Sequence, residues 1–305
     1  MDAIQKTLLQ QVADLHEIPE GAYSLRINGQ LTGKNSSEHI IIEKKADLPG
    51  IDIFIKPGTK KESVHIPVLI AQTGLKELVY NDFHVGEDCD VVIVAGCGIH
   101  NAGEHDSEHS GVHRFFLAKN ARVKYVEKHY GQGDGNGKNI MNPVTEVILD
   151  EGAYLEMETT QIKGVDSTKR MTKGSVAANA TFIVREKLLT HGNQYAETAF
   201  EVTLDGENAN THVVSRSVAK ENSKQLFTSR IDGNNLCNGR SECDAIIMDS
   251  AVVSAIPEIN ANHPDASLVH EAAIGRIAGE QLIKLMTLGL TEKEAEEQII
   301  NGFLK

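Results

Sequence analysis

The sequence contains no tryptophan, and aromatic residues account for only 5% of its 305 positions. Large rigid rings therefore do not build most of its core, and the exposed aromatic side chains common in carbohydrate-cleaving grooves are scarce. Basic residues are also few, because 30 lysines and arginines face 43 acidic residues and leave a net charge of −13. Such a surface repels phosphate backbones and anionic lipids, so we expect neither nucleic acid nor a membrane as a partner.

Cysteine is rare as well. The four cysteines, Cys89, Cys97, Cys237 and Cys243, include no CxxC pair, which favours free thiols in a reducing compartment over a disulfide framework. No signal peptide or membrane span is found, because residues 1–16 contain acidic residues and space their apolar ones as an amphipathic helix does. These features predict a cytoplasmic protein.

What the sequence does contain is a recurrent β pattern, in which a turn residue and a small residue precede an alternating apolar stretch. It occurs at 120–126, 152–158, 179–185, 208–214, 241–248 and 265–271. The spacings are 32, 27 and 29 residues between Ala121, Ala153, Ala180 and Ala209, a period typical of stacked units. Because no helical pattern separates the repeats, they predict a mainly β chain folded as a β-solenoid. A β-sandwich with irregular loops is the alternative.

The two ends of the chain differ from the middle. Residues 1–64 combine the amphipathic helix with two strand patterns, and residues 65–275 hold the repeats. Residues 276–305 contain two apolar helical faces, the second of which opens on a capping-box pattern of Thr291 and Glu294. We expect three regions with these boundaries. The closing helical hairpin either covers the open edge of the solenoid or binds a partner.

A glycine-rich stretch, GQGDGNGK at 131–138, invites comparison with phosphate-binding loops. That motif needs glycine where Gln132 stands and serine or threonine where Asn139 stands, so the match fails. A flexible loop explains these glycines better than a nucleotide site does.

The densest group of ionisable side chains lies between residues 97 and 116 and includes His100, His105, His109 and His113. The last three are spaced by four, so on a helix they would share one face and could hold a metal. Gly111 interrupts such a helix, and in a solenoid the same residues would lie on a polar turn without function. A metal-binding or polysaccharide-acting β-helix enzyme that uses this cluster is the alternative function.

A sparser set consists of Cys243, His270 and Glu271. Twenty-seven residues separate Cys243 from His270, so the two would lie on neighbouring coils about 4.8 Å apart. Thiolate, imidazole and carboxylate together suit a labile iron–sulfur, zinc or copper(I) site. Adjacent residues of a strand point to opposite faces, so either a bulge redirects one or one faces a partner. The alternative is a buried small hydrophobe, a core histidine and a solvated acid.

Several runs carry a family resemblance. They are ECDAIIMDSAVVSAIPEI, LVHEAAIGRI, EQLIKLMTLGLTEKEAEEQIINGF, GCGIH, DSEHSGVHRFFL and NPVTEVILDEGAYLEMET. From about residue 65 onward they resemble the SufB/SufD family, the scaffold of the SUF iron–sulfur assembly machinery. The resemblance implies a right-handed parallel β-helix with helical ends, which is not an enzyme and holds a nascent iron–sulfur cluster transiently. The family's assembly cysteine falls on Cys243, and its His-Glu pair falls on His270 and Glu271.

The same resemblance implies partners. It predicts a SufC-type ABC ATPase docked on residues 276–305, a cysteine desulfurase or other sulfur donor, and a dimeric scaffold. The sequence has features of both paralogues, so the dimer is either a homodimer or a SufB/SufD-like heterodimer. Typical SufD proteins lack the cysteine, so Cys243 favours a SufB-like function. The family pattern gives no firm role to the histidines between residues 100 and 113.

Overall fold

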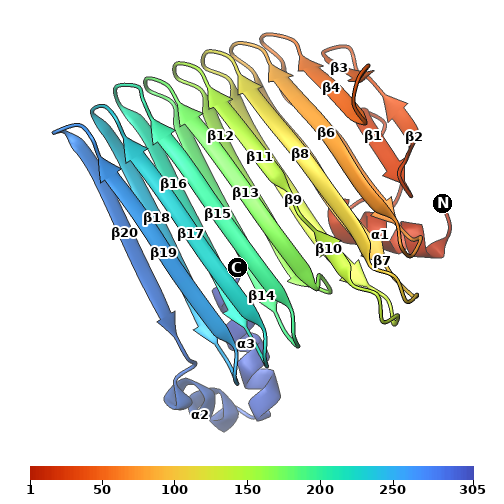
Figure 1. Cartoon of the computed structure of the whole chain (residues 1–305), viewed down its shortest axis with the longest axis vertical. Helices are drawn as coiled ribbons and strands as arrows, with labels where there is room; N and C mark the ends of the chain where they lie inside the picture. Colours follow the sequence, from red (N-terminus) through yellow and green to blue (C-terminus); the bar gives the residue numbers. More distant parts are fainter.

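The computed structural model describes all 305 residues and places two sheets of ten strands each face to face (Figure 1). Sheet A runs in the order β2 (Gln30–Asn35), β1 (Ala22–Ile27), β5 (Lys60–Ile70), β7 (Asp90–His100), β9 (Arg122–Gln132), β12 (Tyr154–Lys163), β14 (Thr181–Thr190), β16 (Ala209–Ala219), β18 (Cys237–Ile247) and β20 (Ala266–Gly275). Sheet B runs in the order β19 (Val252–Ala261), β17 (Lys224–Gly233), β15 (Tyr195–Leu204), β13 (Ser167–Val176), β10 (Asn139–Met141) with β11 (Val144–Leu149), β8 (Ser107–Leu117), β6 (Lys76–Val85), β4 (Gly50–Ile55) and β3 (Ile40–Lys44).

The chain alternates between the two sheets, and each strand of the long middle region pairs in parallel with its counterpart in the next coil. Only the hairpins β1–β2 and β3–β4 near the N-terminus are antiparallel. This is a β-solenoid, as the repeats predicted. Because β1 and β4 already pair with β5 and β6, the N-terminal strands extend the same two sheets, and a domain boundary at residue 64 stays a prediction.

The repeated alanines occupy one position in successive coils of sheet A. The backbone nitrogen of the residue after Ala153 bonds to the Ala121 carbonyl at 2.8 Å, and the same bond links the coils of Ala180 and Ala209 at 2.8 and 2.9 Å. Each alanine is buried, and the residue before it, asparagine or glycine, has positive φ. The small residue is required because the chain turns tightly into the sheet there. The strands of sheet B that alternate with these coils, from β6 onward, were not predicted.

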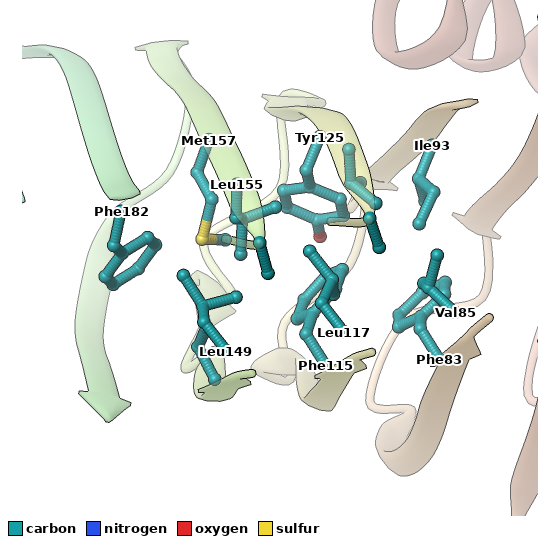
Figure 2. Close-up of a cluster of buried hydrophobic side chains, with 14 of the residues drawn as sticks. Phe83, Val85, Ile93, Phe115, Leu117, Tyr125, Leu149, Leu155, Met157 and Phe182 are labelled. Atoms are coloured by element: carbon teal, nitrogen blue, oxygen red, sulfur yellow. The ribbon is translucent and has the colours of Figure 1, made fainter. Parts of the chain in front are cut away.

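The core fills the space between the sheets. Figure 2 shows Tyr125 and Met157 of sheet A pointing toward Phe115 and Leu149 of sheet B. Alternation along each strand sends every second side chain inward, and burial patterns such as that of β15 follow this alternation without a break. Some inward-facing positions further along the strands carry polar side chains, among them Glu127, Glu186 and Ser215. These positions belong to the candidate site described below.

The N-terminal helix α1 (Ala3–Ala13) covers the outer face of sheet A. Its Leu8 and Val12 are fully buried, and they lie directly on Gly96 and Gly98 of β7. A Cβ atom on Gly96 would approach the Val12 carbonyl oxygen to 2.5 Å, so only glycine permits this close contact. The amphipathic helix predicted for the first residues is confirmed.

The C-terminal helices are α2 (Gly279–Thr287) and α3 (Glu292–Phe303), and the predicted capping box of Thr291 and Glu294 is present. The expectation that this hairpin covers the open edge of the solenoid is wrong. Ile300 of α3 packs against Val218 on the outer face of sheet A, because its apolar side matches that face. The final strands β19 and β20 remain uncovered, because their inward-facing residues Ile259 and Ile274 are 38% and 39% exposed. None of the three helices has the length and apolarity that crossing a bilayer would require.

The glycine-rich stretch at 131–138 is ordered by packing, which corrects its reading as a flexible loop. The nitrogens of Gly135 and Gly137 donate to the carbonyls of Asn101 and Gly103 at 3.2 and 2.9 Å. A Cβ atom on Gly137 would lie 2.2 Å from the backbone oxygen of His105. The glycines therefore let two loops of adjacent coils stack backbone to backbone.

Candidate functional site in the last coils

The four clustered histidines do not share one surface. His100 ends β7, His105 lies on the following loop, and His109 and His113 both point inward from β8. The helical arrangement and the polar-turn placement are therefore both wrong for His109 and His113, which are 6% and 7% exposed. Strand alternation explains the difference, because residues four apart on a strand face the same side just as they do on a helix.

His109 and His113 belong to a buried polar network. His109 Nδ1 lies 3.3 Å from Glu77 Oε2, and His113 Nδ1 lies 2.7 Å from the Tyr125 hydroxyl. Burial lowers the pKa of His113 to about 4, so its ring is neutral at physiological pH. With each imidazole held by a hydrogen-bond partner, these residues stabilise the interior, and the structure does not gather the four histidines as metal ligands.

A row of polar side chains continues from this network along the inside of sheet A. It occupies equivalent positions of successive strands and consists of Glu127, Thr159, Glu186, Ser215 and Cys243. Arg170 of sheet B faces it, donating to Glu127 Oε2 at 2.6 Å and lying 3.9 Å from Glu186 Oε1. Ser215 Oγ donates to Glu186 Oε2 at 2.7 Å. Cys243 is thus the last member of a row that begins with a buried ion pair.

Cys243 points into the solenoid from β18 and is 1% exposed. Burial raises the pKa of its thiol to about 12, with further contributions from the negative charges of Glu186 and Asp244. The thiol is therefore protonated at neutral pH and is a poor metal ligand until its surroundings change. The other three cysteines are also buried free thiols, as the sequence predicted.

His270 lies on β20, the strand adjacent to β18, as the 27-residue spacing predicted. Its register partner is Ser241, whereas Cys243 is opposite Ala272. Because Ser241 and Cys243 both face inward, His270 shares the inner face with the thiol and is displaced by one row. Burial lowers the pKa of His270, and its Nδ1 is buried without a hydrogen-bond partner. A neutral imidazole with a free nitrogen can ligate a metal.

Glu271 points to the outer face of sheet A. Its register partner is Glu242, and its carboxylate accepts a hydrogen bond from Arg240 at 2.7 Å. The pairing of β18 with β20 is continuous, so no bulge turns Glu271 inward. The structure brings Cys243 and His270 to one face and leaves Glu271 on the other; whether these residues bind a cluster stays a prediction.

The buried row from Glu127 to Ser215 was missed in the sequence. Each member occurs at a separate repeat and looks like one polar residue in an alternating strand. A signal was nevertheless present, because Glu127, Glu186 and Cys243 lie six residues after Ala121, Ala180 and Cys237 respectively. Alignment of the repeats on their small residues would have placed them in one row.

Comparison with known proteins identifies relatives of the chain. The family model described as "SUF system FeS cluster assembly, SufBD core domain" matches residues 81–303. A protein of Archaeoglobus fulgidus named "Iron-sulfur cluster assembly SufBD family protein" is 28% identical over 279 residues, which cover 89% of this chain and 72% of that protein. A similarly named protein of Methanocaldococcus jannaschii is 29% identical over 272 residues, covering 88% of this chain and 85% of the relative.

Proposed function

The chain belongs to the SufBD family of the SUF iron–sulfur cluster assembly system, and from this premise we propose that it is a non-enzymatic scaffold on which nascent clusters form. The observation that carries the proposal is the position of Cys243, whose thiol shares the inner face of the solenoid with His270, one strand from its open edge. Sulfur from a cysteine desulfurase or another donor would join iron there. The reducing cytoplasm would keep the thiols free.

Assembly requires the thiol of Cys243 to lose its proton. Binding of iron provides the driving force, because a coordinating metal deprotonates a thiol outright. The closed solenoid buries the thiol, so the last coil must open for iron and sulfur to enter. Its position next to the edge strand β20 makes that opening local, because only one strand of sheet A lies beyond β18.

The open edge supports a dimeric scaffold. Ile259 of β19 and Ile274 of β20 point inward, in register with the buried residues Ile231 and Ala245, yet they are 38% and 39% exposed. No further coil covers them, and an uncovered edge of paired strands invites another chain. A second copy or a SufB/SufD-like paralogue would cover this layer and place groups of a second chain beside Cys243 and His270. Glu271 points to the outer face of sheet A, so it would contact the partner chain from that side.

We expect Ile259→Lys to convert a dimer into a monomer, because the substitution places a charge in the layer that a second chain would cover. Light scattering coupled to size-exclusion chromatography gives the mass. Ile148→Lys is the matched control, since Ile148 is 49% exposed on β11 in the middle of sheet B. A wild-type chain that is monomeric with its ATPase bound, or an unchanged mass in Ile259→Lys, would rule out this edge as the interface.

The C-terminal hairpin is the proposed docking element for a SufC-type ABC ATPase. Helix α2 has no buried residue, and its exposed apolar side chains include Ile283, 63% exposed, with Leu288 just after it at 76%. Helix α3 connects this surface to the site, because its Ile300 belongs to the same apolar cluster as Ile246 of β18. A pull on α2 by ATP-driven motion would therefore reach the strand that carries Cys243.

Ile283→Asp combined with Leu288→Asp should prevent the ATPase from co-purifying, because the paired charges would have to be buried in the contact. Ile4→Asp on the exposed side of α1, 38% exposed, is the control and should retain the ATPase. Affinity purification of the full chain with its co-expressed ATPase measures both. Equal recovery of ATPase with all variants would remove α2 from the contact.

A further inference from the structure

The outer face of sheet B carries a row of charged residues in register across the strands. Its members are Asp52, Asp82, Arg114, Glu146, Lys173, Glu201, Arg230 and Glu258. From Asp82 onward the sign alternates at every step, which stabilises neighbouring strands. The first step breaks the rule, because Asp52 and Asp82 are like charges directly opposite each other. Such a pair is unfavourable unless a cation lies between the two carboxylates.

A histidine completes the group. His84 lies two residues beyond Asp82 on the same face of β6, with its Nε2 3.9 Å from Asp52 Oδ1. Its ring is stacked between Phe54 and Phe116, with centroids 4.8 and 5.1 Å away and planes within 11° and 6° of parallel. One ligand atom from each of Asp52, Asp82 and His84 lies within 4.8 Å of the other two. The aromatic sandwich holds the imidazole in place, as the supporting residues around metal ligands do.

The carboxylate of Asp82 gives a second, independent indication of a metal ion, because one of its oxygens has no partner. The residue is 9% exposed, and its Oδ1 is buried without any hydrogen-bond partner. A buried carboxylate oxygen with no partner costs free energy, so native structures rarely leave one unpaired. Its Oδ2 is bonded to Lys45 Nζ at 2.8 Å, and Arg114 is 3.9 Å from the same oxygen. Lys45 and Arg114 therefore interact only with Oδ2 of Asp82, and Oδ1 is left without a partner.

Lys45 is the cation between the two aspartates. Its ammonium contacts both Asp52 and Asp82. The residue lies just after β3, and residues 46–49 that follow it are exposed and line an open hollow on the surface. Rotation of the long side chain into that hollow would free both carboxylates without breaking a strand. The Lys45 ammonium thus occupies the position between the two carboxylates where a metal ion would bind, and the side chain can leave it.

We propose that Asp52, Asp82 and His84 bind a divalent first-row metal ion, with Lys45 moving aside when the ion enters. Two carboxylates and one imidazole form a mixed oxygen and nitrogen donor set that suits Mn²⁺ or Fe²⁺, with water filling the remaining positions. The site is on the outer face of the N-terminal coils and shares no residue with the Cys243 region. It is therefore a second metal site, independent of the proposed cluster assembly.

Titration of the full-length chain with Mn²⁺, followed by the loss of the free-ion electron paramagnetic resonance signal, tests the site. We expect one ion per chain, and Asp82→Asn should weaken its binding by about tenfold or more. His105→Ala removes an exposed histidine from a separate loop and should leave the affinity unchanged. Binding that is equal in the wild type and in Asp82→Asn would assign the ion to surface carboxylates and overturn the proposal.

Lys45→Met is the second variant, because it keeps all three ligands and the length of the side chain while removing the competing ammonium. We expect it to bind Mn²⁺ more tightly than the wild type does. Its melting temperature should fall without metal, since the aspartates then repel each other, and should rise again with Mn²⁺. Absence of saturable binding in both the wild type and Lys45→Met would overturn the site, whatever the folding state of Asp82→Asn.

Discussion

Cys243→Ala is expected to abolish cluster assembly in this protein while leaving its fold intact. The last two strands of sheet A carry two thiols on their inner face, Cys243 and Cys237. Cys237 lies beside the turn, so Cys243 is the thiol that shares the interior with His270. Soft thiolates are the ligands that iron–sulfur clusters require. The fold should tolerate the change, because the register partners of Cys243 are the small residues Ser215 and Ala272.

Cys237→Ala provides the matched control for this experiment. Cys237 is also buried on β18, but it occupies the row of small residues beside the turn, between Ala209 and Ala266. Both variants and the wild type are reconstituted anaerobically with iron and sulfide, and bound iron and sulfide are measured. We expect bound sulfide to fall by about tenfold or more in Cys243→Ala only. Equal contents in the two variants would exclude Cys243 as a ligand.

Arg170→Leu is expected to cause the largest loss of stability of any single substitution considered. Arg170 and Glu127 are 5% and 3% exposed and form a buried ion pair at 2.6 Å. Burial alone would raise the pKa of Glu127, but Arg170 and His129 hold it well below its usual range. Removal of Arg170 leaves a buried carboxylate without its cation, which costs about 3–5 kcal/mol. The midpoint of urea denaturation should fall accordingly.

An exposed pair supplies the comparison. Arg185 lies on the outer face of β14, where its Nε is 3.1 Å from Glu156 and its side chain is 44% exposed. Arg185→Leu should cost less than about 1 kcal/mol, because water already solvates this pair. If Arg170→Leu were as stable as Arg185→Leu, the interior charges would not hold the two sheets together at this point.

The sequence predicted the parts of the fold that repeat. Ala121, Ala153 and Ala180 mark a turn that only small residues permit, so they were visible at a regular spacing. The strands of sheet B from β6 onward lack such a marker and were missed, whereas the strand patterns at 39–45 and 51–57 correspond to β3 and β4. The path of α3 was also beyond prediction, because an apolar helical face such as that of Ile300 fits the outer face of a sheet as well as an open edge.

The candidate site was predicted in part. The 27-residue spacing placed Cys243 and His270 on adjacent strands correctly, since one coil separates equivalent positions. The spacing does not fix the strand register to within one residue. In the structure Ala272, two residues after His270, lies opposite Cys243, and His270 lies opposite Ser241. Asp52, Asp82 and His84 went unnoticed because Asp52 lies on another strand, 30 residues before Asp82, and only the pairing of β4 with β6 brings them together.

The central claim is that the chain holds a nascent iron–sulfur cluster. The most direct test is to count iron and acid-labile sulfide atoms per wild-type chain in protein isolated anaerobically together with the ATPase proposed as its partner. We predict both elements in comparable amounts, together with visible absorption from thiolate-to-iron charge transfer. Iron without sulfide, or isolated protein devoid of both elements, would contradict the account.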